Sequence, residues 1–523
     1  MKSDVRIFLT CLHICCVFTT VLTYAPKHPI VKTNYGPVIG LTQTSRYGRD
    51  FMSFRGIPYA KPPVGELRFK APEPPEPWSF AVNATQDAPY CIQKNYFFAN
   101  PKVEGKEDCL YLNVYVPQTI RQNLLPVMVF IHWGGFFAGR GSSDIIGPEY
   151  IMDKDVILVS FNYRLGVFGF FTTLDDFAPG NFGLKDQVLA LKFVQENIES
   201  FGGDKNRVTI FGQSAGGGSV SLHLISPSSR GLFQQAISQS GVALNLWAKP
   251  LNILQPNVTA ALASFVGCAD HLGNSSGLVQ CLRKVDAFDL TESGDKFKYF
   301  SIEPLTPYSI VTEQKTDANP NPFLTKEPLE YLQNGEFQKV PWIVGNVQDE
   351  GILRVAQLVR QPEVLKTLND NFNIFLPQML ALQLSVVNTT DLFKNLTNFY
   401  LGGNTFIDIN NTTSVQGFIN LYSDRSFTYG TFQSVILQSQ KLHRPIWLYN
   451  FNYKGQYTYG DPFAATTNKI NFTWGVSHCD DLLYLFKTPA LFPELQEETD
   501  LQMSEDLLTL WTNFAIYGES RKE

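Results

Sequence analysis

The feature that most constrains the fold is a serine between a strand pattern and a helix pattern. The apolar run Val208-Thr-Ile-Phe211 leads into Gly212-Gln-Ser214-Ala-Gly216, and a helix-like apolar pattern follows at residues 220–224. A sharp strand-to-helix turn requires small residues two positions before and after the serine, because the strand and the helix pack closely there. The N-terminus of the helix also favours developing negative charge. The context predicts a nucleophile elbow with Ser214 as nucleophile, whereas the motif alone would fit an ordinary Gly/Ser turn.

A second glycine loop follows another apolar strand pattern upstream of Ser214. Residues 126–131 lead into His132-Trp-Gly134-Gly135-Phe-Phe-Ala-Gly139. Glycines let backbone N–H groups approach a ligand oxygen, and losing one such donor costs about 10²- to 10³-fold in rate. With the elbow, the loop predicts an oxyanion hole formed by Gly134, Gly135 and Ala215. Alone, it would predict only a turn after a strand.

The base and the acid are sought downstream of the serine, in the order serine, acid, histidine. Of the seven histidines, His443 directly precedes a strand pattern, whereas His478 lies in a glycine-containing loop, which can carry an imidazole over the edge of a sheet. We therefore expect His478 as the base, with a surface or capping histidine as the alternative. Asp349 and Glu350 follow the strand pattern at 342–344, and the residues alone do not choose between these carboxylates.

Short apolar strand patterns alternate with helix patterns along the chain. Continuous apolar strands separated by helices predict a mostly parallel sheet buried on both faces. The strands are expected at 127–131, 156–161, 208–211, 342–344 and 446–449, a helix at 184–198, and helical, insert-like structure at 350–440. With 44% hydrophobic and 17% charged residues and a net charge of −6, the chain resembles a globular protein without the electrostatic signature of nucleic-acid binding.

The first residues predict secretion. Lys2 and Arg6 precede an apolar stretch at 7–22, which is typical of a signal peptide over residues 1–25, cleaved near Thr23 to Ala25. A membrane anchor is the alternative, but the stretch is short and interrupted by polar residues. No other run approaches the length of a membrane span, so we expect no span in the mature chain, which forms one domain over residues 26–523.

Secretion places the remaining cysteines in an oxidising compartment. Two close pairs, Cys91 with Cys109 and Cys268 with Cys281, would each close a short surface loop, leaving Cys479 as a thiol. Glycosylation sequons predict surface positions at Asn83, Asn257, Asn274, Asn388, Asn395, Asn410, Asn411 and Asn471.

Together these motifs resemble those of the type-B carboxylesterases, the carboxylesterase and cholinesterase family, from Tyr35 to about Gly518. The resemblance is carried by residues 54–60, 62–65, 107–113, 162–164, 212–217, 349–351 and 475–478. It implies an α/β-hydrolase fold with a large, mostly parallel central sheet flanked by helices, and hydrolysis of a small-molecule ester without a cofactor or metal. It assigns the acid to Glu350, pairs the cysteines as above, and implies structural ion pairs of Arg55 with Glu107 and of Arg164 with Asp186.

The sequence specifies the substrate less closely than it specifies the reaction. Gln213, Arg68-Phe69, Asp186-Gln187 and the spacing from Gly475 through His478 to Asp481 are similar to the motif set of insect juvenile hormone esterases, which other insect esterases share in large part. We expect neutral lipophilic esters, with a juvenile hormone as one option. Cholinesterases carry a tryptophan between the first two cysteines for the choline cation, and none stands at 91–109 here. The physiological ester, acyl-chain preference and oligomeric state stay open.

Two tryptophans are candidate pocket residues. Trp247 resembles an acyl-pocket tryptophan of the family, with a core aromatic as the alternative. Trp133 replaces the first glycine of the usual oxyanion loop, and its indole either narrows the gorge or packs outward against neighbouring loops. The chain also stops short of the usual closing segment of the family, which fits a truncated or shortened C-terminus.

Two other functions compete with an esterase. Some family members are non-catalytic adhesion or binding proteins that have lost the serine, whereas Ser214, Glu350 and His478 are all present here. A neutral lipase differs mainly in pocket shape, which the sequence does not specify.

Overall fold

A central sheet organises the molecule, which we describe from a computed structural model for residues 27–119, 123–384, 388–464 and 473–518. Within these residues the sheet has nine strands in the order β14-β13-β12-β11-β9-β10-β8-β4-β3. The strands from β14 to β10 run parallel, and β8, β4 and β3 continue the sheet antiparallel. Their bounds are β3 Leu41–Thr44, β4 Asp50–Pro58, β8 Tyr111–Pro117, β9 Leu125–Ile131, β10 Ile157–Phe161, β11 Gly203–Gln213, β12 Gln235–Gln239, β13 Trp342–Val347 and β14 Ile446–Phe451.

Side chains of the central strands alternate between two cores. Val127 and Val129 of β9 face one buried cluster, and Met128 and Phe130 face the other. This alternation explains why the strand is apolar throughout, since both faces are covered. The mostly parallel sheet expected from the sequence is confirmed, with an added antiparallel edge.

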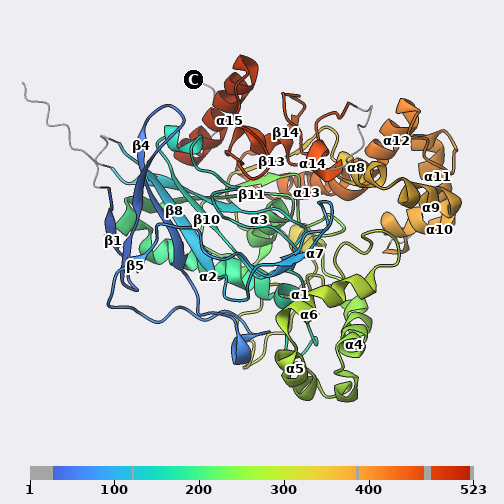
Figure 1. Ribbon diagram of the computed structural model, residues 1–523, viewed down its shortest axis with the longest axis horizontal. Helices are drawn as coiled ribbons and strands as arrows, with labels where there is room; N and C mark the ends of the chain where they lie inside the picture. The colour runs from blue at the N-terminus through green and yellow to red at the C-terminus, as the bar shows by residue number, and fades with distance from the viewer. Residues whose placement is uncertain (1–26, 120–122, 385–387, 465–472, 519–523) are drawn as a thin grey trace, which may run out of the picture.

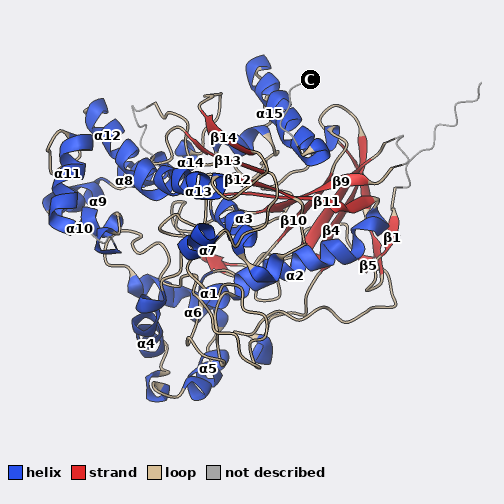
Figure 2. Ribbon diagram, turned by 180° about the vertical axis from the view of Figure 1, so that it is seen from behind, coloured by secondary structure: helices blue, strands red, loops and turns tan. Residues whose placement is uncertain are grey.

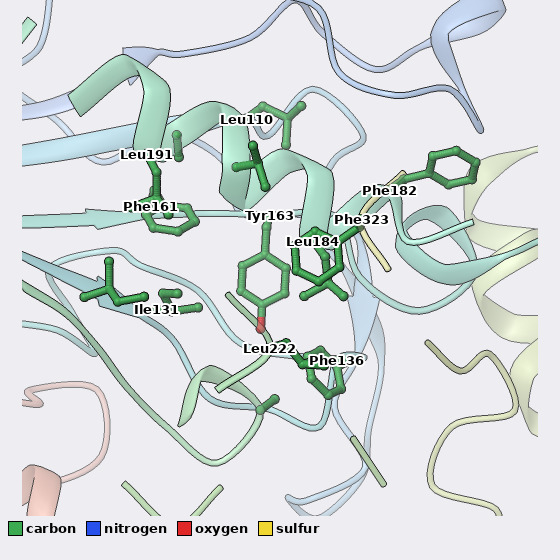
Figure 3. Packing of buried hydrophobic residues seen from close by; sticks show 14 of the residues in the cluster. Leu110, Ile131, Phe136, Phe161, Tyr163, Phe182, Leu184, Leu191, Leu222 and Phe323 are labelled. Carbon is green, nitrogen blue, oxygen red and sulfur yellow. The ribbon is translucent and has the colours of Figure 1, made fainter. Parts of the chain in front are cut away.

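Helices cover both faces of the sheet (Figures 1 and 2). Helices α2 (Phe182–Asn197) and α3 (Ala215–Ile225) pack on one face, and α15 (Glu498–Tyr517) packs on the other. Figure 3 shows the first interface, where Leu184 and Leu191 of α2 lie near Phe161 of β10 and Tyr163 beyond it.

Most of the other helices gather in two lobes beside the sheet (Figure 1), whereas α13 (Tyr429–Ser439) also packs on strands β13 and β14. The region 350–440 is helical, as expected. The remaining helices are α1 Gly166–Phe170, α4 Gln255–Phe265, α5 Ser275–Lys284, α6 Ala287–Glu292, α7 Pro328–Asn334, α8 Ile352–Arg360, α9 Pro362–Asp370, α10 Phe372–Met379, α11 Thr389–Leu401, α12 Thr412–Ser423, α13 Tyr429–Ser439 and α14 Gly460–Ala464.

Five short strands between residues 30 and 104 lie outside the central sheet. Strands β1 Ile30–Lys32, β2 Pro37–Ile39 and β5 Val82–Asn83 form a small separate sheet, and β6 Gln93–Lys94 pairs with β7 Val103–Glu104. The β6–β7 pair lies inside the loop closed by Cys91 and Cys109, so the disulfide closes a segment with structure of its own.

Candidate active site

Ser214 occupies the turn between β11 and α3 in a strained backbone conformation, with φ 56° and ψ −120°. The Ser214 N–H donates to the Gln239 carbonyl at 2.8 Å, which holds the turn against β12. An ideal Cβ at Gly216 would lie 1.9 Å from the Ile131 carbonyl oxygen, and one at Gly212 would lie 2.6 Å from the Gly216 carbonyl carbon. The expected elbow geometry is therefore present, and both glycines are needed for its close packing.

The His478 ring and the Glu350 carboxylate meet in the interior. His478 Nδ1 and Glu350 Oε2 form a hydrogen bond, and both side chains are almost fully buried. Glu350 Oε1 accepts from Asn346 Nδ2 and from the Val347 N–H, each at 3.1 Å. The carboxylate is thus fixed on both oxygens, and its contact at Nδ1 favours the tautomer that leaves Nε2 as the basic nitrogen.

Asp349 has a different position from its neighbour. Its Oδ1 accepts from Gln416 Nε2 at 2.9 Å, and its Oδ2 accepts from the Val476 N–H at 3.1 Å. The Asp349 N–H donates to the Val476 carbonyl at 3.0 Å. Asp349 therefore binds the backbone of the loop that carries His478, not its ring.

Gln213 lies against the imidazole as well. Its Nε2 is 3.3 Å from His478 Nε2 and 3.5 Å from Nδ1, and its Oε1 accepts from the Cys479 thiol at 3.3 Å. In the part of the chain that the structure describes, no hydrogen bond joins Ser214 Oγ to the His478 ring. Contacts between a nucleophile and its base commonly tighten only in the substrate complex.

The glycine loop after β9 lies beside the elbow, because Ile131 at the end of β9 pairs with Gly212 of β11. Gly134 and Gly135 both have positive φ, and an ideal Cβ at Gly134 would lie 2.0 Å from the Ala138 carbonyl oxygen. Ala215 is the first residue of α3, where an N–H has no partner within the helix. Among the described residues, the N–H groups of Gly134, Gly135 and Ala215 make no hydrogen bond, so all three remain available as donors.

His132 and Tyr163 support this loop. Their rings stack with centroids 4.3 Å apart, His132 Nδ1 lies 2.8 Å from the Trp133 carbonyl oxygen, and the Tyr163 hydroxyl donates to the His132 carbonyl at 3.1 Å. Burial lowers the pKa of His132 to about 4. The ring is therefore neutral at physiological pH and donates through Nδ1, which fixes the backbone just before the two glycines.

The two tryptophans have different surroundings. The Trp133 indole packs edge-on against Phe98 at 6.2 Å and Tyr459 at 6.0 Å, and it borders a surface cavity of about 230 Å³ beside the Cys91–Cys109 loop. The Trp133 indole therefore packs against neighbouring segments of the chain. Trp247 is half-buried, with its ring 6.3 Å from Phe136 of the glycine loop and 5.8 Å from Phe427.

Phe427 and the Asp481 carboxylate were not among the expected site residues. The Phe427 ring lies 4.8 Å from the His478 ring. Asp481 is fully buried and accepts from Gln239 Nε2 at 2.7 Å. Burial, together with the nearby charge of Glu350, raises its pKa to about 6. The spacing from His478 to Asp481 was a usable signal, whereas nothing local marks Phe427.

The covalent and ionic framework agrees with the expectations except at one ion pair. Disulfides join Cys91 to Cys109 and Cys268 to Cys281, and Cys479 is a buried free thiol. Arg164 Nη2 lies 2.7 Å from Asp186 Oδ1, as expected.

The expected pair of Arg55 with Glu107 is wrong. A β-bridge to Thr85 directs Arg55 toward Asp87, 2.9 Å away, while Glu107 accepts from Arg68 Nε and Nη2 at 2.7 and 2.6 Å. Glu107 is already bound by both nitrogens of one guanidinium, a geometry that carboxylates favour.

The predicted surface asparagines are exposed wherever they are described, namely Asn83, Asn257, Asn274, Asn388, Asn395, Asn410 and Asn411. Asn471 and the expected signal peptide, residues 1–25, lie outside the described residues. None of the helices in the described part of the chain combines the length and apolarity needed to cross a bilayer.

Comparisons with known proteins place the chain in a family. A profile of the carboxylesterase family matches residues 27–523. The chain is 70% identical to the juvenile hormone esterase of Tribolium castaneum over 99% of its own length and 88% of that protein, and 38% identical to a carboxylic ester hydrolase of Bombus ignitus over 94% and 86%. Its structure is similar to that of juvenile hormone esterase from Manduca sexta with OTFP covalently attached, with a TM-score of 0.82 and 30% identity over 95% of this chain and 91% of that one. The chain therefore belongs to the carboxylesterase family and is a carboxylic ester hydrolase with the α/β-hydrolase fold.

Proposed function

We propose that the protein is a secreted serine esterase that cleaves neutral lipophilic esters, including a juvenile hormone, through Ser214, His478 and Glu350. The observation that carries the proposal is the buried contact of His478 Nδ1 with Glu350 Oε2 beside the strained Ser214 turn. A buried acid that holds an imidazole in one tautomer is the arrangement that activates a serine hydroxyl.

The reaction follows from the roles of these groups. His478 Nε2 accepts the Ser214 hydroxyl proton as Oγ attacks the ester carbonyl carbon. The N–H groups of Gly134, Gly135 and Ala215 stabilise the negative oxygen of the tetrahedral intermediate. The imidazolium then protonates the leaving alcohol, and the acyl group stays on Ser214. Water, deprotonated by His478, releases the acid and restores the serine.

The substrate class is supported by the surroundings and by the relatives. Ring contacts join Phe136 to Trp247, Trp247 to Phe427 and Phe427 to His478, so a series of aromatic rings connects the glycine loop with the base. Apolar rings favour lipophilic groups over charged ones. The 70% identity to a protein named juvenile hormone esterase supports the methyl ester of a sesquiterpenoid as one substrate.

The test is hydrolysis by the full chain recovered from the culture medium of a eukaryotic host, with Ser214→Ala produced in parallel. We expect wild-type protein to cleave p-nitrophenyl acetate, butyrate and octanoate and a juvenile hormone, and Ser214→Ala to cleave none of them measurably. N-terminal sequencing of the recovered protein should begin near residues 23–26. Absence of hydrolysis by folded wild-type protein would reject the enzymatic assignment, and retention in the cell would reject secretion.

A further inference from the structure

A π-helical turn interrupts the long helical segment beside the candidate site. Helix α12 runs to Ser423, the π turn spans Asp424–Thr428, and α13 continues from Tyr429. π turns are rare, and those found inside helices often lie at functional sites. This one contacts the candidate triad, because its Phe427 ring packs on the His478 ring.

Two carbonyl groups of the turn bind the loop that carries Trp247. The Ser426 carbonyl accepts from Trp247 Nε1 at 2.9 Å, and the Phe427 carbonyl accepts from Asn245 Nδ2 at 2.8 Å. Asn245 is buried, and its Oδ1 accepts from the Val242 N–H at 2.7 Å. Two side-chain hydrogen bonds thus join the π turn to the loop that carries Trp247, and one of the donors, Asn245, is itself held by the backbone of that loop.

The Phe427 side chain reaches the base. The residue is 3% exposed, and its ring lies 4.8 Å from the His478 ring with a tilt of 46°. Glu350 binds the ring at Nδ1, and Gln213 lies against both nitrogens. Within the described ranges, the polar contacts of the imidazole come from Glu350 and Gln213, and Phe427 adds an apolar ring contact to them.

Helix α12, which precedes the π turn, packs against the turn that carries the acid Glu350. The Gly351 N–H donates to Ser423 Oγ at 2.8 Å, and the Ser423 hydroxyl donates to the Ile419 carbonyl at 2.7 Å. An ideal Cβ at Gly351 would lie 2.2 Å from the Ile419 carbonyl oxygen, so α12 packs directly on the residue after Glu350.

We infer that the π turn Asp424–Thr428 is a positioning element for the esterase reaction, with Phe427 as the positioning residue that fixes the orientation of the His478 imidazole. The inference rests on the proposed function. Helix α12 contacts Gly351, next to the acid, while the π turn that continues it contacts the base and Trp247, so one continuous helical segment borders all three. Small misplacements of reacting groups cost up to about 100-fold in rate.

The test compares kcat and KM for p-nitrophenyl acetate, an ester too small to need the pocket wall. We expect Phe427→Leu, which keeps an apolar side chain but removes the ring, to lower kcat by about 10- to 100-fold with little change in KM. Phe427→Tyr keeps the ring and should retain near-wild-type kcat. The matched control is Phe432→Leu, the same change on the exposed face of α13, which should leave kcat unchanged.

A second variant displaces the turn without altering the ring. An ideal Cβ at Gly430 would lie 2.6 Å from Asn245 Nδ2, so Gly430→Ala should push the π turn away from the Trp247 loop and also lower kcat for the acetate. Wild-type kcat in Phe427→Leu or in Gly430→Ala, each shown to be folded by one cooperative melting transition above the assay temperature, would overturn the inference. Activity in Ser214→Ala would instead overturn the proposed function, so the two failures are distinguishable.

Discussion

Asp349 and Glu350 are neighbours in the chain, yet Asp349 binds the backbone of the loop that carries His478, and Glu350 binds the His478 ring. Removing each carboxylate should therefore have a different consequence. We expect Glu350→Ala to lower kcat about 10⁴-fold, because the imidazole loses its orienting acid. Asp349→Ala should cost much less in kcat but about 1 to 3 kcal/mol in stability, since it leaves the buried Val476 N–H without its acceptor.

Kinetics and chemical denaturation of the two variants, with Glu350→Gln and Asp349→Asn as isosteric controls, check this division. A larger loss of kcat at Asp349 than at Glu350 would mean that the acid has been assigned to the wrong residue.

Trp133→Gly should act through packing. The indole packs on Phe98 and Tyr459, and truncating a buried tryptophan costs about 3 to 5 kcal/mol. Because Trp133 directly precedes Gly134, a loosened loop should lower kcat/KM for acetate and octanoate esters to the same extent. Trp133→Phe, which keeps part of the contact, should be milder. A selective gain for bulky esters in Trp133→Gly would show instead that the indole obstructs the gorge.

Choline esters should be poor substrates. No tryptophan stands between Cys91 and Cys109, and the ring of Phe98 there is stacked on Phe463 at 5.9 Å. A missing cation–π contact of about 0.5 to 2 kcal/mol corresponds to a preference for neutral esters of a few-fold to about thirty-fold in kcat/KM. Comparing butyrylcholine with a neutral butyrate ester measures this, and faster turnover of butyrylcholine would reveal another aromatic cation site.

Much of the fold was predictable because the strands carry strong local signals. Residues 127–131 are apolar throughout, since β9 is buried on both faces, and the strand extends two residues further, from Leu125. The antiparallel edge was less visible: β3 is only partly buried, and its residues lack a continuous apolar pattern.

The candidate site was predictable where a motif fixes a turn, as at Ser214 and Gly134. It was not predictable where contacts are long-range. Arg55 pairs with Asp87 because of a bridge to Thr85 that no local pattern encodes. Phe427, which contacts His478, lies in a π turn, and the sequence around it looks like ordinary helix.

The buried carboxylate of Asp481 should make stability depend on pH. Burial raises its pKa from 3.8 to about 6, so between about pH 4 and 6 the folded chain keeps a proton that the unfolded chain has released. Its contribution to the free energy of unfolding therefore falls as pH rises through that window. Asp481→Asn should be more stable than wild type by about 3 kcal/mol at pH 7 and nearly equal below pH 4.

Urea denaturation across pH 3.5 to 7.5 checks the Asp481 prediction, with exposed Asp270→Asn as the control expected to show no such trend. A difference between Asp481→Asn and wild type that does not grow with pH would contradict it.

The central claim, that Ser214 is the nucleophile activated by His478, is tested most directly by mass spectrometry after reaction with diisopropyl fluorophosphate. The account predicts one diisopropylphosphoryl group per wild-type chain, on the peptide that contains Ser214, no label on Ser214→Ala, and labelling of His478→Ala slowed by several orders of magnitude. A label on any other residue, or equally fast labelling of Ser214 in folded His478→Ala, would contradict it.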